Sequence, residues 1–241
     1  MSLLSLISQQ NSNHPYHNSR HSYMVAEYAK QVFQEYIKTH PHTPSYIYLS
    51  LFQIFVAERG HDVAHPGKNV TQQDEEESAK IMKNILKGNI SDSEKLKEHI
   101  CESVGYLIIN GTKFEGRNPV LKEKISQNVL LKIMQDADIL YLGDTYDVFI
   151  EGSIRYAVEQ MEGGDFSEEI LNNSLSFTVG GFREMILQRN EANNSPFYME
   201  ESQILYPNFH KNMKTLKGQL ESEDLKKQAK TIYDIYYKNS L

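Results

Sequence analysis

The chain has 241 residues, of which 39% are hydrophobic and 24% are charged, and its formal net charge is −7 at pH 7. These values are typical of a globular protein and exclude a disordered or collagen-like chain. The lysines and arginines are scattered, so we expect no binding to duplex nucleic acid. A small anionic ligand is still compatible with this charge if a metal ion supplies a local positive field.

No stretch of the sequence approaches the length that crosses a bilayer, and the first residues, MSLLSLIS, lack the basic flank and the apolar length of a signal peptide. Cys101 is the single cysteine, which excludes an intramolecular disulfide and is compatible with a reducing compartment. We therefore expect a cytoplasmic protein with no membrane partner.

The first two long helices are expected before residue 61. Apolar residues recur at helical spacing from residue 19 to about residue 38, which predicts a helix that ends before THPHTP. The next segment, SYIYLSLFQIFVAE, is apolar almost all round and predicts a buried helix, with a strand as the alternative because of its aromatic and β-branched residues. Glu58 and Arg59 follow its apolar part and precede Gly60, and we expect the helix to break just before His61 and Asp62.

Two more helices are expected before residue 112. The acidic residues of QQDEEESAKIMKNILKG suit a helix N-terminus, and Gly88 suits its C-cap. We interpret the run from Asp74 to Glu77 as a solvated first turn. A further helix is predicted in SDSEKLKEHICESVGYLIIN, followed by a loop in NGTKFEGRNP, where glycine, asparagine and proline gather.

Helical patterns also fill the second half of the chain. They run through VLKEKISQNVLLKIMQDADILYLG, YDVFIEGSIRYAVEQM, SEEILNNSLSFTVGGFREMILQR, FHKNMKTLKGQL and SEDLKKQAKTIYDIYYK. Because strict apolar alternation and internal repeats are absent, we predict an all-α fold in a single helical domain over residues 1–241. The candidate site residues fall in about 14–145 and further helices in about 146–241; the oligomeric state is not indicated.

Two pairs of histidines stand out: His17 and His21 in YHNSRH, and His61 and His65 in HDVAHPG. Each pair has a four-residue spacing, which on a helix places both rings on one face. Imidazole is a good ligand for Zn, Fe and Mn, and the carboxylate of Asp62 adds the harder ligand that Mg or Mn prefers. These residues predict a site for divalent metal ions.

A further ligand is expected from QDADILYLG, where Asp136 and Asp138 are both candidates. The other histidines lie outside the two motifs, and we interpret them as helix caps or as core residues that form hydrogen bonds. They are His14, His40, His42, His99 and His210.

The two histidine motifs resemble those of class I cyclic-nucleotide phosphodiesterases, Tyr-His-Asn-x-x-His and His-Asp-x-x-His-Pro-Gly, within the HD superfamily of metal-dependent phosphohydrolases. The resemblance covers about the first 140 residues, and EEESAKIM and DADILYLG look more like bacterial HD-domain hydrolases. It implies an all-α HD-type bundle that binds one or two divalent metal ions (Zn, Mn, Mg or Fe) and hydrolyses a small anionic phosphoester.

The resemblance also implies a set of metal ligands. By position, they are His21, His61, Asp62 and Asp138, with Asp62 as the bridging residue. Asp138 is preferred over Asp136 because the family pattern has an alanine directly before its ligand, and Ala137 fits.

Three residues match catalytic positions of the phosphodiesterases. His17 matches the general acid, and His65 matches the second histidine of the longer motif, near the metal-bound hydroxide. Glu77 lies at about the position of the glutamate that orients the acid histidine, although Ser78 and Ala79 follow it where the phosphodiesterases have histidines. The chemistry agrees, since metal ions lower the pKa of a bridging water and an imidazolium held by a carboxylate can protonate a departing alkoxide.

Two features near the presumed substrate depart from the phosphodiesterase pattern. In HPGKN, Asn69 arrives one residue earlier than in the family, which leaves its role open. In SFTVGGFREM, Thr178 stands where the phosphodiesterases have a glutamine that hydrogen-bonds the purine, so recognition of a base should differ. The pair Gly180-Gly181 in the same stretch indicates a helix kink or a close packing point.

We therefore expect a metal-dependent phosphohydrolase that prefers a phosphodiester or a cyclic nucleotide. Hydrolysis of phosphomonoesters or nucleoside phosphates is the alternative within the same superfamily. A non-catalytic metal-binding HD module is a second alternative, but it would not need a proton donor such as His17. A di-iron oxygenase is disfavoured because those HD proteins have extra histidines between the His-Asp pair and the last aspartate, where this chain has only His99 besides His65 of the motif itself.

Overall fold

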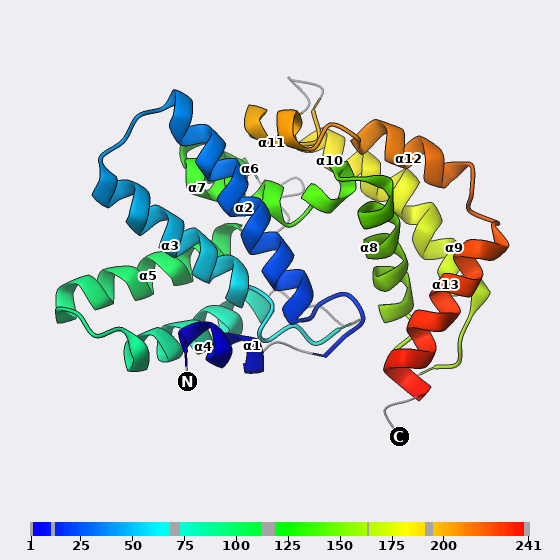
Figure 1. Cartoon of the computed structure of the whole chain (residues 1–241), viewed down its shortest axis with the longest axis horizontal. Helices are drawn as coiled ribbons and strands as arrows, with labels where there is room; N and C mark the ends of the chain where they lie inside the picture. Colours follow the sequence, from blue (N-terminus) through cyan, green and yellow to red (C-terminus); the bar gives the residue numbers. More distant parts are fainter. Residues whose placement is uncertain are drawn as a thin grey trace.

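Helices make up the regular structure of the chain in the computed structural model, which describes residues 2–10, 13–67, 73–111, 119–162, 164–190 and 195–238. Extended backbone pairs in these ranges only as two isolated bridges, so the predicted all-α fold is confirmed (Figure 1). The α-helices are α1 (Leu3–Gln10), α2 (Ser19–Thr39), α3 (Pro44–Gly60), α4 (Asp74–Asn89), α5 (Glu94–Gly111), α6 (Pro119–Gln127), α7 (Val129–Ala137), α8 (Tyr146–Glu159), α9 (Glu168–Phe177), α10 (Arg183–Arg189), α11 (Glu200–Leu205), α12 (Phe209–Lys217) and α13 (Glu223–Tyr233). A 3-10 turn, η1 (Leu140–Gly143), and two π-turns, η2 (Thr178–Phe182) and η4 (Asp234–Lys238), complete them.

The start of α2 is set by its N-cap residue. The side-chain oxygen of Asn18 accepts hydrogen bonds from the backbone N–H groups of Arg20 (2.9 Å) and His21 (3.1 Å), which satisfies donors that a helix N-terminus otherwise leaves open. His17 therefore lies outside the helix and His21 in its first turn. The expectation that both rings share one helical face is wrong for this pair, because the cap separates them.

The apolar segment before the second motif is a helix, α3, and not a strand. It runs through Glu58 and Arg59 and ends at Gly60, so the predicted end of the helix just before His61 is confirmed. Gly60 allows the close approach of α4, since a Cβ there would lie only 2.3 Å from the sulfur of Met82. His61 caps the C-terminus of α3, and the backbone beyond it turns, so His65 lies outside the helix as well.

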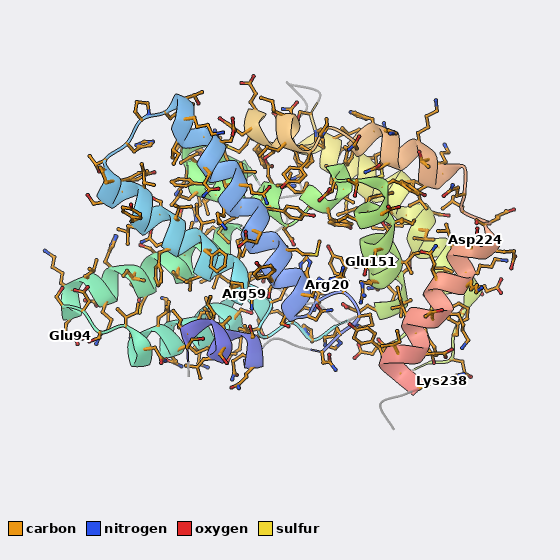
Figure 2. The ribbon with its side chains drawn as sticks, viewed as in Figure 1. Arg20, Arg59, Glu94, Glu151, Asp224 and Lys238 are labelled. Atoms are coloured by element: carbon orange, nitrogen blue, oxygen red, sulfur yellow. The ribbon has the colours of Figure 1, made fainter. Side chains whose placement is uncertain are left out.

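Arg59 links the end of α3 to the start of α2 (Figure 2). Its guanidinium donates hydrogen bonds to the backbone oxygen of Ser19 (2.8 Å) and to the hydroxyl of Ser22 (3.2 Å). The two helix ends that carry His21 and His61 are thereby held side by side.

Two further boundaries differ from the expectations. Helix α4 continues past Gly88 to Asn89. The long pattern over 120–143 divides at Asn128, whose side chain caps α7 by accepting from the N–H groups of Leu130 (3.0 Å) and Leu131 (3.4 Å). Most of the predicted loop NGTKFEGRNP lies outside the described residues.

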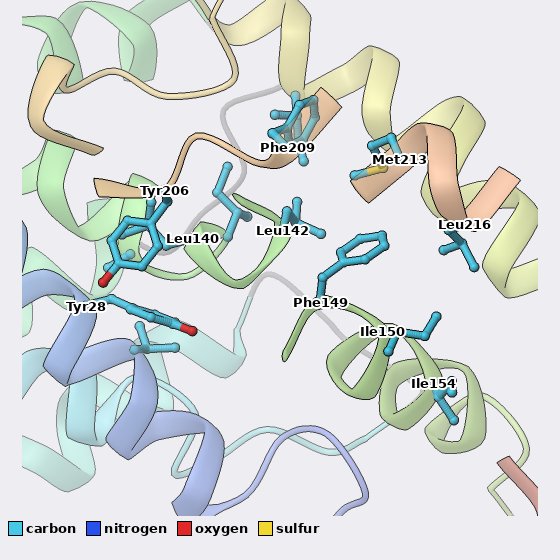
Figure 3. Close-up of a cluster of buried hydrophobic side chains, with 14 of the residues drawn as sticks. Tyr28, Leu140, Leu142, Phe149, Ile150, Ile154, Tyr206, Phe209, Met213 and Leu216 are labelled. Carbon is cyan, nitrogen blue, oxygen red and sulfur yellow. The ribbon is translucent and has the colours of Figure 1, made fainter. Parts of the chain in front are cut away.

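The buried apolar side chains form two clusters that meet at α3 and α7. One joins α1, α3, α4, α5, α6 and α7, and the other joins α2, α3, α7, α8, α9, α10, α12 and α13. Figure 3 shows part of the second cluster, where Tyr28 of α2 packs edge to face on Tyr206, at 5.0 Å between ring centroids, and Phe149 of α8 is fully buried. Among the described helices, none is both long and apolar enough to cross a membrane.

Candidate metal centre

The four side chains that the motifs select as metal ligands lie together where three helices end. His21 comes from the first turn of α2, His61 and Asp62 follow α3, and Asp138 follows α7. The Nε2 atom of His61 is 2.9 Å from Oδ2 of Asp62 and 3.7 Å from Oδ1 of Asp138. The Nε2 atom of His21 is 3.4 Å from the same oxygen of Asp62 and 3.3 Å from that of Asp138. Three separate segments thus present donor atoms to one point.

This arrangement fits a divalent metal ion. His21, His61 and Asp138 offer donor atoms within 4.8 Å of one another. The Nε2 atom of His21 and Oδ2 of Asp62 are buried, and neither has a hydrogen-bond partner within the described part of the chain. Buried polar atoms are normally paired, so two unpaired atoms aimed at a common point fit the donor atoms of a cation site. Two imidazoles with two carboxylates form a donor set suited to first-row divalent ions.

The charges of the cluster favour ionised carboxylates. Burial raises the pKa of Asp138, but the nearby rings of His21 and His61 outweigh it and hold this pKa well below its usual range. Burial lowers the pKa of His61, whereas the charge of Asp62 raises it and prevails. The Nδ1 atom of His61 lies 2.7 Å from the backbone oxygen of Glu58, to which it donates, and this orients Nε2 toward the aspartates.

Asp136, the alternative ligand, points elsewhere. It is fully buried, and its two oxygens accept hydrogen bonds from the backbone N–H groups of Tyr198 and Met199, both at 2.8 Å. Burial raises the pKa of this carboxyl to about 6. Asp136 therefore ties the end of α7 to the segment before α11, while Asp138 faces the histidines.

We expect Asp136→Asn to destabilise the metal-free protein by about 1–3 kcal/mol, because an amide has one acceptor oxygen and leaves one of the two buried N–H groups unpaired. Urea unfolding followed by circular dichroism measures this loss. Metal content should stay at the wild-type level, since Asp136 does not face the cluster. Loss of metal with unchanged stability would contradict this role for Asp136.

His17 is held by a carboxylate from a distant helix. Its Nδ1 atom is 2.5 Å from Oε1 of Glu159, the last residue of α8, and the backbone N–H groups of Tyr16 (2.9 Å) and His17 (3.0 Å) donate to Oε2. Burial lowers the pKa of His17, but the charge of Asp62 and the hydrogen bond to Glu159 outweigh burial, so the pKa lies above its usual value. Burial raises the pKa of Glu159, and its bond with His17 outweighs this and brings that pKa down to about 2. A charged imidazolium is favoured.

Glu77, which the resemblance placed beside His17, lies at the surface. Its side chain is 51% exposed and forms an ion pair with Lys80 at 3.1 Å. The assignment is wrong because the first turn of α4 directs Glu77 to solvent, whereas Glu159 reaches His17 across 142 residues of sequence. No local motif marks Glu159. The sequence signal at this position is that an acidic residue directly follows Ala157 and Val158, which are buried, in an apolar helix.

His65 stacks on His17, with ring centroids 3.5 Å apart and an interplanar angle of 19°. Its Nδ1 atom accepts a hydrogen bond from the N–H of Gly67 at 3.1 Å, and Gly67 has a φ of 82° that favours glycine. Burial and the charge of His17 lower the pKa of His65 to about 4. The ring of His65 is therefore neutral, whereas the adjacent ring of His17 is charged. Two stacked imidazoles thus differ in protonation because their surroundings shift their pKa values in opposite directions.

Two cavities open beside these residues. The metal cavity, of about 470 Å³, is lined by His17, His61, Asp62, His65, Asp74, Glu75, Ser78 and Asp138. Asp74 and Glu75 are only partly exposed, so the acidic run is not wholly a solvated turn as predicted. His17, His65 and Glu159 form a second group whose donor atoms are close enough to hold an ion.

The second cavity, of about 540 Å³, is called the aromatic cavity here. Its lining is Tyr16, His17, Asp138, Ile139, Tyr141, Tyr156, Phe177, Thr178 and Phe182. Thr178 does occupy this wall, and its hydroxyl donates to the backbone oxygen of Ser174 at 3.1 Å. Gly180 and Gly181 lie in the π-turn η2, and the wider turn of a π-helix accommodates the extra glycine of this stretch. Asn69, whose role was left open, lies outside the described residues.

A solved structure shares this arrangement of helices. The crystal structure of the phosphodiesterase domain of the rhodopsin phosphodiesterase from Salpingoeca rosetta matches with a TM-score of 0.65, over 91% of this chain and 80% of that chain. The chain has the fold of a phosphodiesterase domain. Sequence identity in this match is 15%, and no family model and no curated protein matches the sequence.

The phosphodiesterase fold extends beyond the part in which the motifs occur. The resemblance of the motifs covers about the first 140 residues, whereas the structural match covers 91% of the chain. The C-terminal helices therefore belong to the same fold, in agreement with the contact of Glu159 from α8 with His17 and with the place of Phe182 from η2 in the wall of the aromatic cavity. The resemblance inferred from two short motifs is confirmed at the level of the fold.

Proposed function

We propose that this protein is a metal-dependent phosphohydrolase whose preferred substrates are phosphodiesters, cyclic nucleotides among them. The observation that carries the proposal is the pair His17 and Glu159, 2.5 Å apart, which lies beside the cluster of histidines and aspartates. A metal site with a purely structural purpose needs no proton donor at its edge. The fold shared with a phosphodiesterase domain supports the same class of reaction.

The metal ligands in this proposal are His21, His61, Asp62 and Asp138. Divalent ions held there would supply a nucleophile at neutral pH and neutralise charge on the phosphoryl oxygens. The protein's own contribution is the orientation of the ligands, in which the backbone oxygen of Glu58 fixes the ring of His61.

His17 is the proposed general acid. It lines both the metal cavity and the aromatic cavity, so a phosphoester that spans the two would have its leaving oxygen near this ring. Glu159 keeps the imidazolium protonated and oriented, and the proton passes to the departing alkoxide. The neutral ring of His65 avoids the repulsion that a second imidazolium would exert on His17.

The aromatic cavity is the proposed site of the leaving group or of a nucleoside base. Tyrosine and phenylalanine rings dominate its lining, and flat apolar walls favour stacking over hydrogen bonding. The hydroxyl of Thr178 is engaged by its own helix, so this position offers no paired donor and acceptor for the edge of a base. We infer weak discrimination between bases.

We expect bis(nitrophenyl) phosphate, cyclic AMP and cyclic GMP to be hydrolysed with kcat/KM values within roughly 100-fold of one another, because strong discrimination requires buried polar groups that a wrong substrate leaves unpaired. The measurement is a turnover assay with purified protein supplied with Mn²⁺, Mg²⁺ or Zn²⁺. Nucleoside monophosphates and nitrophenyl phosphate serve as the phosphomonoester comparison.

The assay separates the alternatives. Efficient hydrolysis of phosphomonoesters with every diester inert would replace the phosphodiesterase proposal by a nucleotidase-like activity with the same ligands. A protein that binds metal and hydrolyses none of these esters would support the non-catalytic HD module instead.

A further inference from the structure

The ring of His17 lies on a short loop ahead of α2, so its position depends on what holds that loop. The side-chain amide of Asn18 donates a hydrogen bond to the backbone oxygen of Pro15 at 3.1 Å. Glu159 of α8 accepts the backbone N–H of His17 at 3.0 Å. A second side chain of α8, that of Arg155, contacts the same loop and has no role in the function proposed above.

The guanidinium of Arg155 donates hydrogen bonds in three directions. Its Nη1 atom donates to the backbone oxygen of Pro15 at 3.3 Å and to the hydroxyl of Tyr236, in the C-terminal turn η4, at 3.2 Å. Its Nε atom donates to Oε1 of Glu151 at 2.9 Å. The same carboxylate binds Arg20 in the first turn of α2, with Nη2 of Arg20 at 2.9 Å from Oε2 (Figure 2). Because a guanidinium is planar and rigid, these bonds together fix its orientation toward the loop.

Arg155 and Glu159 hold the loop by opposite groups. They are four positions apart on α8 and therefore lie on the same face of that helix. Arg155 binds a backbone carbonyl of the loop, whereas Glu159 binds backbone N–H groups and the ring of His17. Two attachment points that are one helical turn apart prevent the loop from pivoting about Glu159 alone. The direction of the His17 ring therefore depends on both residues.

We propose that Arg155 is a positioning residue for proton transfer, which acts by holding the loop that carries His17. A displacement of about 1 Å in a reacting group can cost roughly 100-fold in rate, so the loss of a loop tether has a measurable effect on turnover. Tyr236 extends this support to the C-terminal turn η4. The inference rests on the proposed function, in which His17 is the general acid, and it concerns proton transfer rather than metal binding.

The test compares two Arg155 variants on two matched substrates. Arg155→Met keeps the length of the side chain and removes its donors, and Arg155→Lys keeps the charge without the planar fork of a guanidinium. The substrates are bis(nitrophenyl) phosphate and diphenyl phosphate, which are similar in shape, but phenolate needs a proton more than nitrophenolate does. Turnover with Mn²⁺, metal content and urea unfolding are measured for each protein.

Two further proteins complete the comparison. The double variant His17→Asn with Arg155→Met shows whether Arg155 acts through His17, because the effects of residues that work as one unit do not add. Lys230→Met is the matched control, since it also removes a cation that contacts η4, where Lys230 pairs with Asp234 at 2.5 Å.

We expect Arg155→Met to lower kcat for diphenyl phosphate about 10- to 100-fold and kcat for the nitrophenyl diester less than about 3-fold, with metal content unchanged. The Lys variant should lie between the Met variant and wild type, and the control should equal wild type. In the His17→Asn background, Arg155→Met should cause no further loss.

Wild-type turnover in Arg155→Met, equal losses on the two substrates, loss of bound metal, or a fully additive loss in the double variant would overturn the proposal. If Arg155→Met does not fold, Arg155→Lys is judged by the same criteria. A wild-type protein that hydrolyses neither diester, or a His17→Asn variant without loss, would overturn the proposed function itself, whereas an active wild type with unaffected Arg155 variants removes this inference alone.

Discussion

Replacement of Asp62 by alanine is expected to remove bound metal and reduce hydrolysis to the level of metal-free protein. Oδ2 of Asp62 is the atom shared by the two histidines, at 2.9 Å from His61 and 3.4 Å from His21, so its loss withdraws a ligand from the centre of the site. The fall in metal affinity should exceed the roughly 100-fold that loss of a residue behind a ligand can cause. Elemental analysis after gel filtration measures the occupancy.

The aspartates at the end of α7 provide the comparison for this result. Asp138→Ala should also lose metal, because Asp138 lies 3.3 Å from Nε2 of His21, whereas Asp136→Asn should keep it. Full occupancy in the Asp138 variant would show that the ligand set is chosen wrongly.

Replacement of His17 by asparagine is expected to retain the metal and to lower turnover of alkyl phosphodiesters by roughly 10²- to 10⁴-fold, the usual effect of losing a general acid. The loss should shrink for a nitrophenyl ester, whose leaving group needs little protonation. Steady-state assays on both kinds of substrate, with metal content measured on the same samples, test this expectation.

Glu159→Gln is the companion variant. Its amide can still contact the ring of His17 but does not carry the charge that favours the imidazolium, so turnover should fall in the same substrate-dependent way. Glu77→Gln is the matched control and should leave turnover unchanged, because Glu77 is exposed and paired with Lys80. Equal losses for good and poor leaving groups in the His17 variant would remove His17 from the acid role.

Local features of the sequence are sufficient to predict where helices form and which types of side chain serve as candidate ligands. Apolar periodicity predicts α2 from residue 19, since a helix that packs on one side must repeat its apolar residues every three or four positions. The motifs also single out His21, His61 and Asp62 as candidate ligands, because each stands in a short stretch of sequence at the end of a helix. These properties depend on short stretches of chain, and short stretches can be interpreted without the rest of the fold.

Other features depend on which distant segments meet. Glu159 reaches His17 from 142 residues away, and the competing candidate Glu77 was plausible only because sequence position says little about which side of α4 faces the site. The two aspartates around Ala137 have the same chemistry, and the choice between them follows from packing: Asp136 is buried against the backbone of residues 198 and 199, which leaves Asp138 to face the histidines. Long-range contacts of this kind arise from the packing of whole helices, and for that reason no local pattern encodes them.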